Sequence, residues 1–430
     1  GAYSQRYLSG GNRNIAIGPY AGDQTTSGSN NIAIGYQALK TNTVVGNQLA
    51  IGYEALRSNT TGFSNHAIGY QALKSNVDGK YNLAVGVFSL IANTSGEYNA
   101  SFGTEASGSN TTGIKNTAIG HYALRLNSTG NENTAVGYRA SAFHKGTKNT
   151  AVGFESLSSS GEGNENTAIG SHALKSSTSG HSNTAVGKSS LMDVITGQYN
   201  TATGAHSLEN TTGGLNTAVG YGAGDALTSG TKNVYIGHDA EASAGNVQNE
   251  VAIGQGVTGA GSNTVSIGNT QITAIKGQVA FSTYSDERIK RNIDDSKLGL
   301  NFIMKLRPVT YKMKNPADYP NELLEARFRD VPGNGPFVGE YERPADDENT
   351  YDGLIAQEVK EAMDEVGVNW SGWSKNESDG KEGVQYGALT IPLIKAIQEL
   401  SSKIDELEKQ QEVIDELKER VLELEKAKSI

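Results

Sequence analysis

The feature that most constrains this chain is a glycine that recurs at nearly constant spacing through its first 268 residues. Sixteen such glycines, most of them preceded by Ala and then Ile or Val, follow one another in steps of 17, apart from two steps of 16 and a final step of 14. They are Gly18, Gly35, Gly52, Gly69, Gly86, Gly103, Gly120, Gly137, Gly153, Gly170, Gly187, Gly204, Gly220, Gly237, Gly254 and Gly268. A short unit repeated so many times cannot bury its own apolar face, and it therefore predicts a stack of similar coils.

Each unit contains a short strand with two apolar faces. Counting from the glycine, position −1 is almost always Ile or Val, as in Ile119, and position −2 is mostly Ala, as in Ala118. Successive residues of a strand point to opposite faces, so both faces must be covered. We expect the alanines to point into the coil and the Ile and Val side chains to meet the same strand of neighbouring chains. This arrangement predicts a homotrimer or a similar bundle.

Asparagine occupies position −4 in thirteen of the sixteen units, and the exceptions are Gln48, Glu250 and Thr264. Stacked amides can hydrogen-bond along the direction of stacking, so we interpret this column as an asparagine ladder. A row of ligand-binding asparagines is the alternative. The uniform recurrence favours the ladder, because a local binding site has no need for thirteen copies.

The repeats resemble a known class of surface fibre. Units of the form Asn-x-Ala-Ile-Gly-x-x-Ala-Leu over residues 11–270 are similar to the head repeats of trimeric autotransporter adhesins. That resemblance implies a parallel β-roll in a three-chain bundle.

Composition excludes several other classes of protein. Glycine is abundant (53 residues) beside 8 prolines, without the period of collagen, and the chain has no cysteine, so it has neither disulfides nor thiolate metal sites. A net charge of −10 argues against a nucleic-acid partner, and no apolar run is long enough for membrane insertion. The sequence starts at Gly1 without Met or a signal peptide, and we expect that anchoring information lies in a segment upstream of it.

After residue 270 the glycine period stops and the density of charge rises. Four motifs follow in order: Ser-Thr-Tyr-Ser-Asp-Glu-Arg-Ile-Lys-Arg-Asn-Ile (282–293), Leu-Arg-Pro-Val-Thr-Tyr-Lys-Met-Lys (306–314), Gly-Leu-Ile-Ala-Gln-Glu-Val (353–359) and Tyr-Gly-Ala-Leu (386–389). Together they strongly resemble the intramolecular chaperone domain of endosialidases and phage tail fibres, the peptidase S74 family. The resemblance implies a domain that trimerises, assists folding of the fibre upstream and then removes itself. It places the cleavage site at Ser285-Asp286 and the catalytic pair at Ser285 and Lys290. The stretch between Lys314 and Gly353 is expected to be a loop or arm particular to this protein.

The chemistry of that pair follows from its residue types. A serine hydroxyl is a weak nucleophile that needs a nearby base, and a lysine serves when burial or neighbouring cations favour its uncharged form. Arg288 and Arg291 are the cations nearest in sequence, and a helix beginning at residue 286 would bring Lys290 within about one turn of Ser285. The plain structural alternative is that Ser285 only caps this helix.

The C-terminal segment carries a heptad pattern. Its apolar positions alternate in steps of four and three: Leu393, Ile397, Leu400, Ile404 and Leu407, then, after a shift across residues 409–412, Ile414, Leu417, Val421 and Leu424. This seam predicts a trimeric coiled coil with a stammer or a break at the shift. An amphipathic helix packed on its own domain is the alternative. The predicted fold is thus mainly β: a lead-in (1–10), a β-roll or β-solenoid stalk (11–270), a linker (271–284), an α+β chaperone domain (285–392) and a coiled-coil helix (393–430).

Two weaker patterns belong to the repeats. Position +1 is often aromatic, as in Tyr36, Tyr53 and Tyr70, and we expect an aromatic ladder rather than a sugar-binding platform. The seven histidines show no spacing typical of a metal site. We therefore predict no metal and no cofactor.

These patterns favour a homotrimeric extracellular fibre that binds a cell-surface receptor or glycan, such as a phage tail fibre on the virion, with self-cleavage as its one expected enzymatic activity. A bacterial surface adhesin of the same architecture is an alternative. A polysaccharide-degrading tailspike is another, but it needs a cleft with paired carboxylates, and the few acidic residues of the repeats form no recurring pair of that kind.

Overall fold

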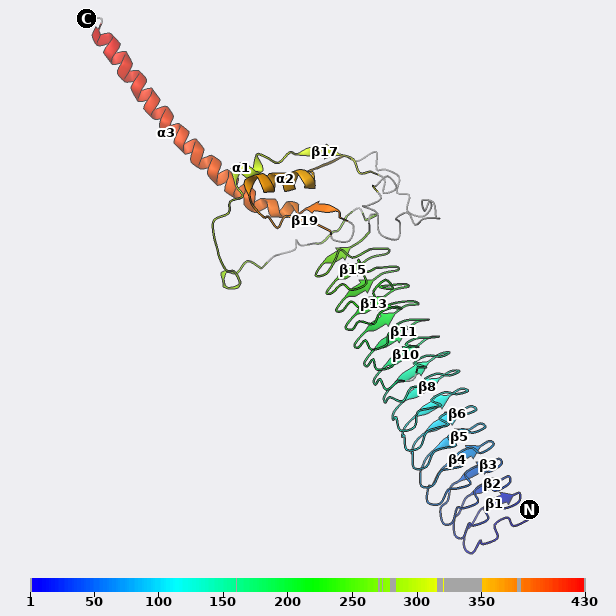
Figure 1. The fold of residues 1–430 in the computed structure, drawn as a ribbon. Coiled ribbons are helices and arrows are strands. Elements are labelled where there is room, and N and C mark those ends of the chain that lie inside the picture. The colour runs from blue at the N-terminus through cyan, green and yellow to red at the C-terminus, as the bar shows by residue number, and fades with distance from the viewer. Residues whose placement is uncertain are drawn as a thin grey trace. The chain divides into compact units, whose positions relative to one another are not determined.

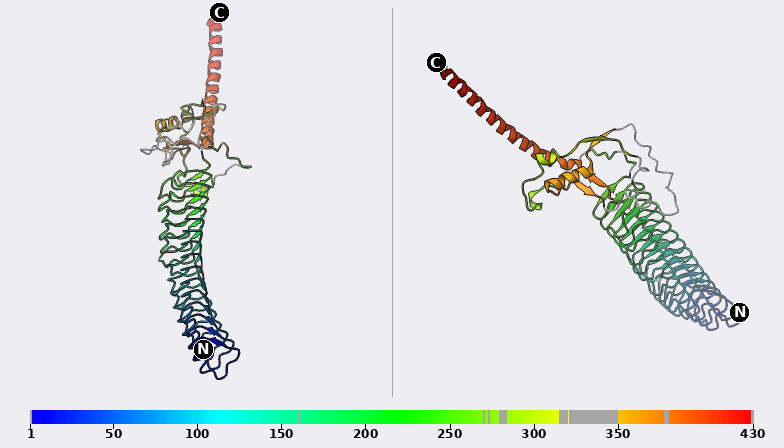
Figure 2. Two further views of the ribbon diagram at one scale, coloured as in Figure 1. Left: turned by 90° about the vertical axis from the view of Figure 1, so that its right-hand side faces the viewer. Right: turned by 45° about the horizontal axis from the view of Figure 1, so that its top comes forward.

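The computed structural model describes residues 2–159, 161–269, 271–272, 274–278, 284–314, 320, 350–376 and 380–428. The chain divides into two compact units, Gly1–Asn269 and Thr270–Ile430 (Figure 1; Figure 2). Most of the stretch between Lys314 and Gly353, which we expected to be a loop or arm, lies outside the described residues.

The first unit is a parallel β-solenoid with one three-residue strand per coil. Its sixteen strands form one sheet in sequence order, and each pairs in parallel with the next at a shift of one repeat, as Ala118 does with Ala135. The strands are β1 (Ile15–Ile17), β2 (Ile32–Ile34), β3 (Leu49–Ile51), β4 (His66–Ile68), β5 (Leu83–Val85), β6 (Ala100–Phe102), β7 (Thr117–Ile119), β8 (Thr134–Val136), β9 (Thr150–Val152), β10 (Thr167–Ile169), β11 (Thr184–Val186), β12 (Thr201–Thr203), β13 (Thr217–Val219), β14 (Val234–Ile236), β15 (Val251–Ile253) and β16 (Val265–Ile267). The predicted fold class, a mainly β chain built on a parallel solenoid, is confirmed.

The two faces of each strand differ as predicted. At position −2 the alanine is buried inside the coil, and Ala118 and Ala135 have no exposed surface. At position −1 the side chain points outward, and Ile119 keeps 43% of its surface exposed. The outward face also carries position −3, which is Thr117 in the same strand, because residues two apart share a face.

The repeat glycine is required by the bend after each strand. Gly120 has φ +131°, a region that side chains with a β-carbon rarely adopt, and a β-carbon there would lie 2.4 Å from the carbonyl oxygen of Gly137. The coil therefore turns where the backbones of successive repeats come closest.

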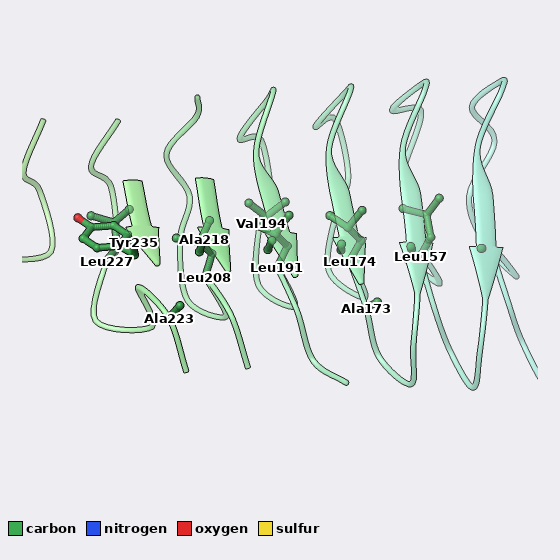
Figure 3. Close-up of a cluster of buried hydrophobic side chains, with 14 of the residues drawn as sticks. Leu157, Ala173, Leu174, Leu191, Val194, Leu208, Ala218, Ala223, Leu227 and Tyr235 are labelled. Carbon is green, nitrogen blue, oxygen red and sulfur yellow. The ribbon is translucent and has the colours of Figure 1, made fainter. Parts of the chain in front are cut away.

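The interior is filled by small and branched apolar side chains in columns that run along the stack (Figure 3). Leu157, Leu174 and Leu191 lie side by side in successive coils and are fully buried. Near the C-terminal end of the stack, Tyr235 takes the place of an inward alanine and is also fully buried. Gly224 leaves the space for it, since a β-carbon on Gly224 would lie 2.7 Å from the Tyr235 ring.

Two asparagine ladders run through the coils. The predicted ladder at position −4 is confirmed: the backbone N–H of Asn82 donates to Oδ1 of Asn65 over 3.0 Å, and its side-chain Nδ2 donates to the carbonyl oxygen of Gly96 over 2.8 Å. A second buried column, which the repeat pattern did not lead us to predict, lies at position +7. There Nδ2 of Asn93 donates to Oδ1 of Asn76 over 2.7 Å.

The N-terminal residues also bond to the stack. The backbone N–H of Gln5 donates to the carbonyl oxygen of Ala21 over 3.1 Å. The backbone N–H of Tyr7 donates to the carbonyl oxygen of Asp23 over 3.3 Å. Residues 2–10 thus hydrogen-bond to the first coil that carries a strand.

The second unit holds the helices. Its elements are η1 (Glu287–Ile289), α1 (Leu300–Ile303), β17 (Val309–Tyr311), β18 (Tyr351–Gly353), α2 (Ala356–Val366), β19 (Trp373–Lys375), β20 (Glu382–Val384), η5 (Tyr386–Leu389) and α3 (Thr390–Lys428). Strands β17 and β18 pair antiparallel, and so do β19 and β20. A small core of Phe302, Val359, Ala362, Met363 and Trp370 joins α1 to α2.

Helix α3 spans 39 residues without interruption. It is continuous through residues 409–412, so the shift in the heptad pattern is not a break in the helix. Its N-terminal part packs against α1, where Oε2 of Glu399 accepts a hydrogen bond from the backbone N–H of Leu300 over 2.8 Å. The side chains of the seam, Leu400 and Leu417 among them, are exposed along the helix.

Candidate functional site

Ser285 and Lys290 meet at the start of the second unit. Nζ of Lys290 donates a hydrogen bond to Oγ of Ser285 over 2.7 Å. The 3-10 helix η1 between them reverses the chain and brings the two side chains together. The predicted pair is thus in direct contact.

The cap of this helix is Asp286 and not Ser285. Oδ1 of Asp286 accepts from the backbone N–H of Arg288 over 2.9 Å, which is the typical bond of an N-cap. The alternative in which Ser285 serves only as the cap is therefore wrong. The Ser285 hydroxyl faces the lysine instead.

One of the two arginines that we expected to act on Lys290 is engaged elsewhere. The Arg288 guanidinium binds the Asp286 carboxylate, with Nε 3.0 Å from Oδ1. This hydrogen bond holds the pKa of Asp286 below its usual range. The charge of Arg288 is thus offset by its neighbour.

The site is open to solvent in a single chain. Residues 284–294 are all exposed, and η1 packs against none of the other helices or strands in the described part of the chain. A lysine acts as a base only in its uncharged form, which burial favours. The geometry brings Ser285 and Lys290 into contact but does not bury them from solvent.

The other three C-terminal motifs meet in the small α+β region. Nε of Arg307, from the second motif, donates to Oε2 of Glu358 in the third over 3.0 Å. The backbone N–H of Leu354, also in the third motif, donates to the hydroxyl of Tyr386 in the fourth over 2.9 Å. An open pocket beside this meeting point is lined by Tyr311, Leu354, Ile355, Glu382, Val384 and Tyr386.

Three glutamates of the solenoid are paired with cations. Glu54, Glu105 and Glu155 all occupy position +2, three coils apart, and each contacts a basic residue of the next coil. The pairs are Glu54–Lys74 at 2.7 Å, Glu105–Arg125 at 2.8 Å and Glu155–Lys175 at 3.0 Å. Three coils separate neighbouring glutamates by about 14 Å, whereas glycosidase carboxylates lie about 5–9.5 Å apart. These glutamates therefore form no such catalytic pair.

One buried carboxylate has no cationic partner. Glu250 replaces the ladder asparagine near the end of the stack and accepts from the Tyr235 hydroxyl at 3.0 Å and from the backbone N–H of Ser243 and Gly261 at 3.2 and 2.9 Å. Burial raises the pKa of the Tyr235 phenol, which therefore stays a donor. The sequence marked Glu250 as an exception but gave no sign of its donors, which lie up to fifteen residues away. This cluster ends the asparagine ladder.

The aromatic column stacks as expected. The rings of Tyr36 and Tyr53 are 5.2 Å apart and those of Tyr53 and Tyr70 are 5.1 Å apart, nearly parallel in both pairs. Their faces are turned toward each other, which favours the ladder over a sugar platform. Among the described residues, no cluster of three or more His, Asp or Glu side chains is arranged to hold a metal ion.

No described helix combines the length and the apolar character needed to cross a membrane.

No curated protein matches the chain. Residues 285–368 match the family model described as chaperone of endosialidase, peptidase S74. The match begins at Ser285 and includes Lys290, the second motif and the third. The C-terminal part of this chain therefore contains a chaperone-of-endosialidase domain, which follows a parallel β-solenoid.

Proposed function

We propose that this chain is a subunit of a homotrimeric extracellular fibre for attachment to a host cell, of the kind carried on a phage virion as a tail fibre. Its C-terminal domain gathers three chains, assists the folding of the solenoid and then cuts the chain between Ser285 and Asp286. The observation that carries the proposal is that a chaperone-of-endosialidase domain follows a solenoid with one long, exposed and uncharged face. A receptor or surface glycan is the expected ligand.

That face consists of positions −3 and −1 of all sixteen strands. Neither column contains Asp, Glu, Lys or Arg in any coil, and the one titratable side chain is His66. Sixteen strands at about 4.8 Å spacing and three residues of width give a face of about 75 by 10 Å. Its area of about 750 Å² is close to the roughly 800 Å² that each partner buries in a stable protein interface. Other copies of the chain, which carry the same uncharged face in the same periodicity, are the occupants that fit it.

The exposed seam of α3 supports the same assembly. Ile397, Leu400 and Ile404 are solvent-exposed in a single chain, although apolar residues at a and d positions of a heptad belong in a helical interface. The outward face of the solenoid and the seam of α3 are thus both uncovered in a single chain. A three-chain bundle covers both.

The cleavage step is a hydrolysis of one peptide bond. Lys290, once uncharged, takes a proton from a water molecule through the Ser285 hydroxyl, and the water oxygen attacks the carbonyl carbon of Ser285. The amine of Asp286 leaves with a proton, and one water molecule is consumed to give a new carboxylate on the upstream fragment. The 2.7 Å contact of Nζ with Oγ supports these roles.

The test is to produce the chain alone and to characterise its fragments. We expect a stalk that ends at Ser285 and a small fragment that begins at Asp286, identified by N-terminal sequencing. Ser285→Ala and Lys290→Ala should each leave an uncut chain that is still trimeric by native mass measurement. Ser296→Ala, a serine further along the same segment, should cut normally. A cut at another bond, or cleavage that persists in Ser285→Ala, would refute the proposed site, and a monodisperse monomer would refute the fibre.

A further inference from the structure

One strand differs from all others on the outward face. In β6, position −3 is Ala100, the smallest side chain of its column, and position −1 is Phe102, the largest of its column. Every other strand carries Ile, Leu, Val, Thr or His at −3 and Ile, Val or Thr at −1. The loss of volume at one position thus coincides with the gain at the other.

Such paired changes mark side chains that share one space. The interior of the same solenoid shows the effect, because Tyr235 is accommodated where Gly224 removes a side chain. Phe102, however, is not accommodated within its own chain: 39% of its surface remains exposed. The space that Ala100 leaves therefore has to be filled across the interface.

From this we infer that β6 is the register key of the assembly: Phe102 of each chain packs into the space above Ala100 of its neighbour. The inference rests on the proposed trimer. Around a three-fold axis each chain presents −1 to one neighbour and −3 to the other, so three identical contacts close into a ring at this level. Close-packed interfaces penalise both the overfilled and the empty site, so a mismatch at this level is unfavourable.

The register key matters because the repeat makes it easy for two chains to pair out of register. Coils of nearly constant length make a slip by one coil almost neutral for the Thr, Val and Ile side chains of the face. A slip of one coil places Phe102 against Thr117 or Leu83 instead of Ala100, where no space exists. One irregular strand is thus enough to distinguish the correct register from its neighbours.

The first test moves the key by one coil. In a chain with Ala100→Thr, Phe102→Ile, Thr117→Ala and Ile119→Phe, the outward pairs of β6 and β7 are exchanged, and each pair is kept together within its own chain. The moved-key chain should form trimers as well as the wild type. When the two chains are coexpressed with different tags, random mixing would make roughly three quarters of the trimers mixed. We expect mixed trimers to be about tenfold rarer than that, since two levels would be mismatched in register, and a one-coil slip that realigned the two keys would pull the C-terminal domains of the trimer out of register.

The second test stays at one level. Ala100→Leu should lower the thermal midpoint of the trimer, and adding Phe102→Val, which copies the β5 pair Leu83 and Val85, should restore it. Random mixing in the first test, or no rescue in the second, overturns the register key while leaving the trimer in place. Failure of the wild type itself to form trimers overturns the proposed fibre instead.

Discussion

The side-chain amide of Asn93 donates to Oδ1 of Asn76 over 2.7 Å inside the solenoid, where both residues are fully buried. The same Nδ2 also donates to the carbonyl oxygen of Gly96 over 3.1 Å. One amide thus joins its own turn to the coil before it. Buried polar groups must be paired in this way, because leaving one unpaired costs the full price of its desolvation.

Replacing Asn93 with Ala should therefore destabilise the solenoid by about 1–3 kcal/mol per chain, since Oδ1 of Asn76 loses its donor inside the core. The measurement is the shift in thermal midpoint. Asn210→Ala is the matched control, because Nδ2 of Asn210 donates to Asp225 at the exposed surface. Equal effects of the two substitutions would contradict a ladder that stabilises the interior.

Gly120→Ala should be more harmful than its small change in volume suggests. The backbone conformation at φ +131° costs a residue with a β-carbon about 1–3 kcal/mol, and the new atom would overlap the carbonyl of Gly137. We expect a loss of soluble stalk. Gly10→Ala is the control, because a β-carbon there meets no atom nearer than 3.9 Å and the φ angle is ordinary. A stable Gly120→Ala stalk would mean that the coils do not approach so closely.

The ion pair of Glu155 and Lys175 should make stability depend on pH. The hydrogen bond from Lys175 is the main cause that holds the pKa of Glu155 below its usual range. A carboxylate with a depressed folded-state pKa contributes stability above the unfolded-state pKa, and this is lost as the pH falls through the folded-state value. Glu155→Gln should thus cost about 0.5–1 kcal/mol at pH 7 and almost nothing at an acidic pH below the depressed folded-state pKa of Glu155.

The check is thermal melting of wild type and Glu155→Gln at both pH values. Glu132→Gln serves as the control, because its pair with Lys115 is long, at 3.6 Å, and about half exposed. It should leave the melting curves unchanged. A Glu155→Gln deficit that is the same at both pH values would assign the effect to packing and not to charge.

Much of the solenoid could be predicted because every coil repeats the same pattern of residues. The strand positions, the inward alanines, the −4 ladder and the bend at the glycine all follow from one column pattern. The second ladder, Asn76 and Asn93 among it, was missed for a physical reason: asparagine in a polar segment favours a turn, and its burial depends on identical residues one coil away. The left-handed backbone of Leu39 and its equivalents, at φ +52°, was likewise not predicted, since leucine has no preference for it.

The cleavage segment was predicted in outline but not in detail. Spacing brought Ser285 and Lys290 together, yet the short helix is 3-10 and is capped by Asp286. Which of the neighbouring residues Ser285 and Asp286 caps the helix depends on their backbone angles. Sequence spacing does not contain that information.

Substituting Ile119 with Asp should prevent assembly while sparing the coil. The side chain points outward, so a single chain can solvate the carboxylate, but three chains would bury three like charges at one level. An unpaired charge in an interface costs about 3 kcal/mol or more per chain. Trimer yield, measured by native mass, should fall sharply, and Ser95→Asp on an exposed turn should assemble normally. Normal trimers from Ile119→Asp would mean that this face is not the interface.

Assembly and cleavage should be linked through the seam of α3. Leu400→Asp places a charge at a core position of the heptad, and it should prevent trimerisation of the C-terminal domain. Because Ser285 and Lys290 are exposed in a single chain, the site should then lack the burial that the reaction needs, and the chain should remain uncut although both residues are unchanged. Ser402→Asp, on the outer side of the same helix, should trimerise and cut like the wild type.

Gel analysis beside native mass separates the outcomes. Cleavage that proceeds in monomeric Leu400→Asp would show that one chain supplies everything the reaction needs, and that the exposure of Lys290 is no obstacle. Uncut monomer would instead mean that the other chains complete the site. In that case the cut follows assembly. Once the chaperone domain has been released, an unfolded stalk can no longer refold with its help. The lifetime of the folded stalk is then set by its rate of unfolding.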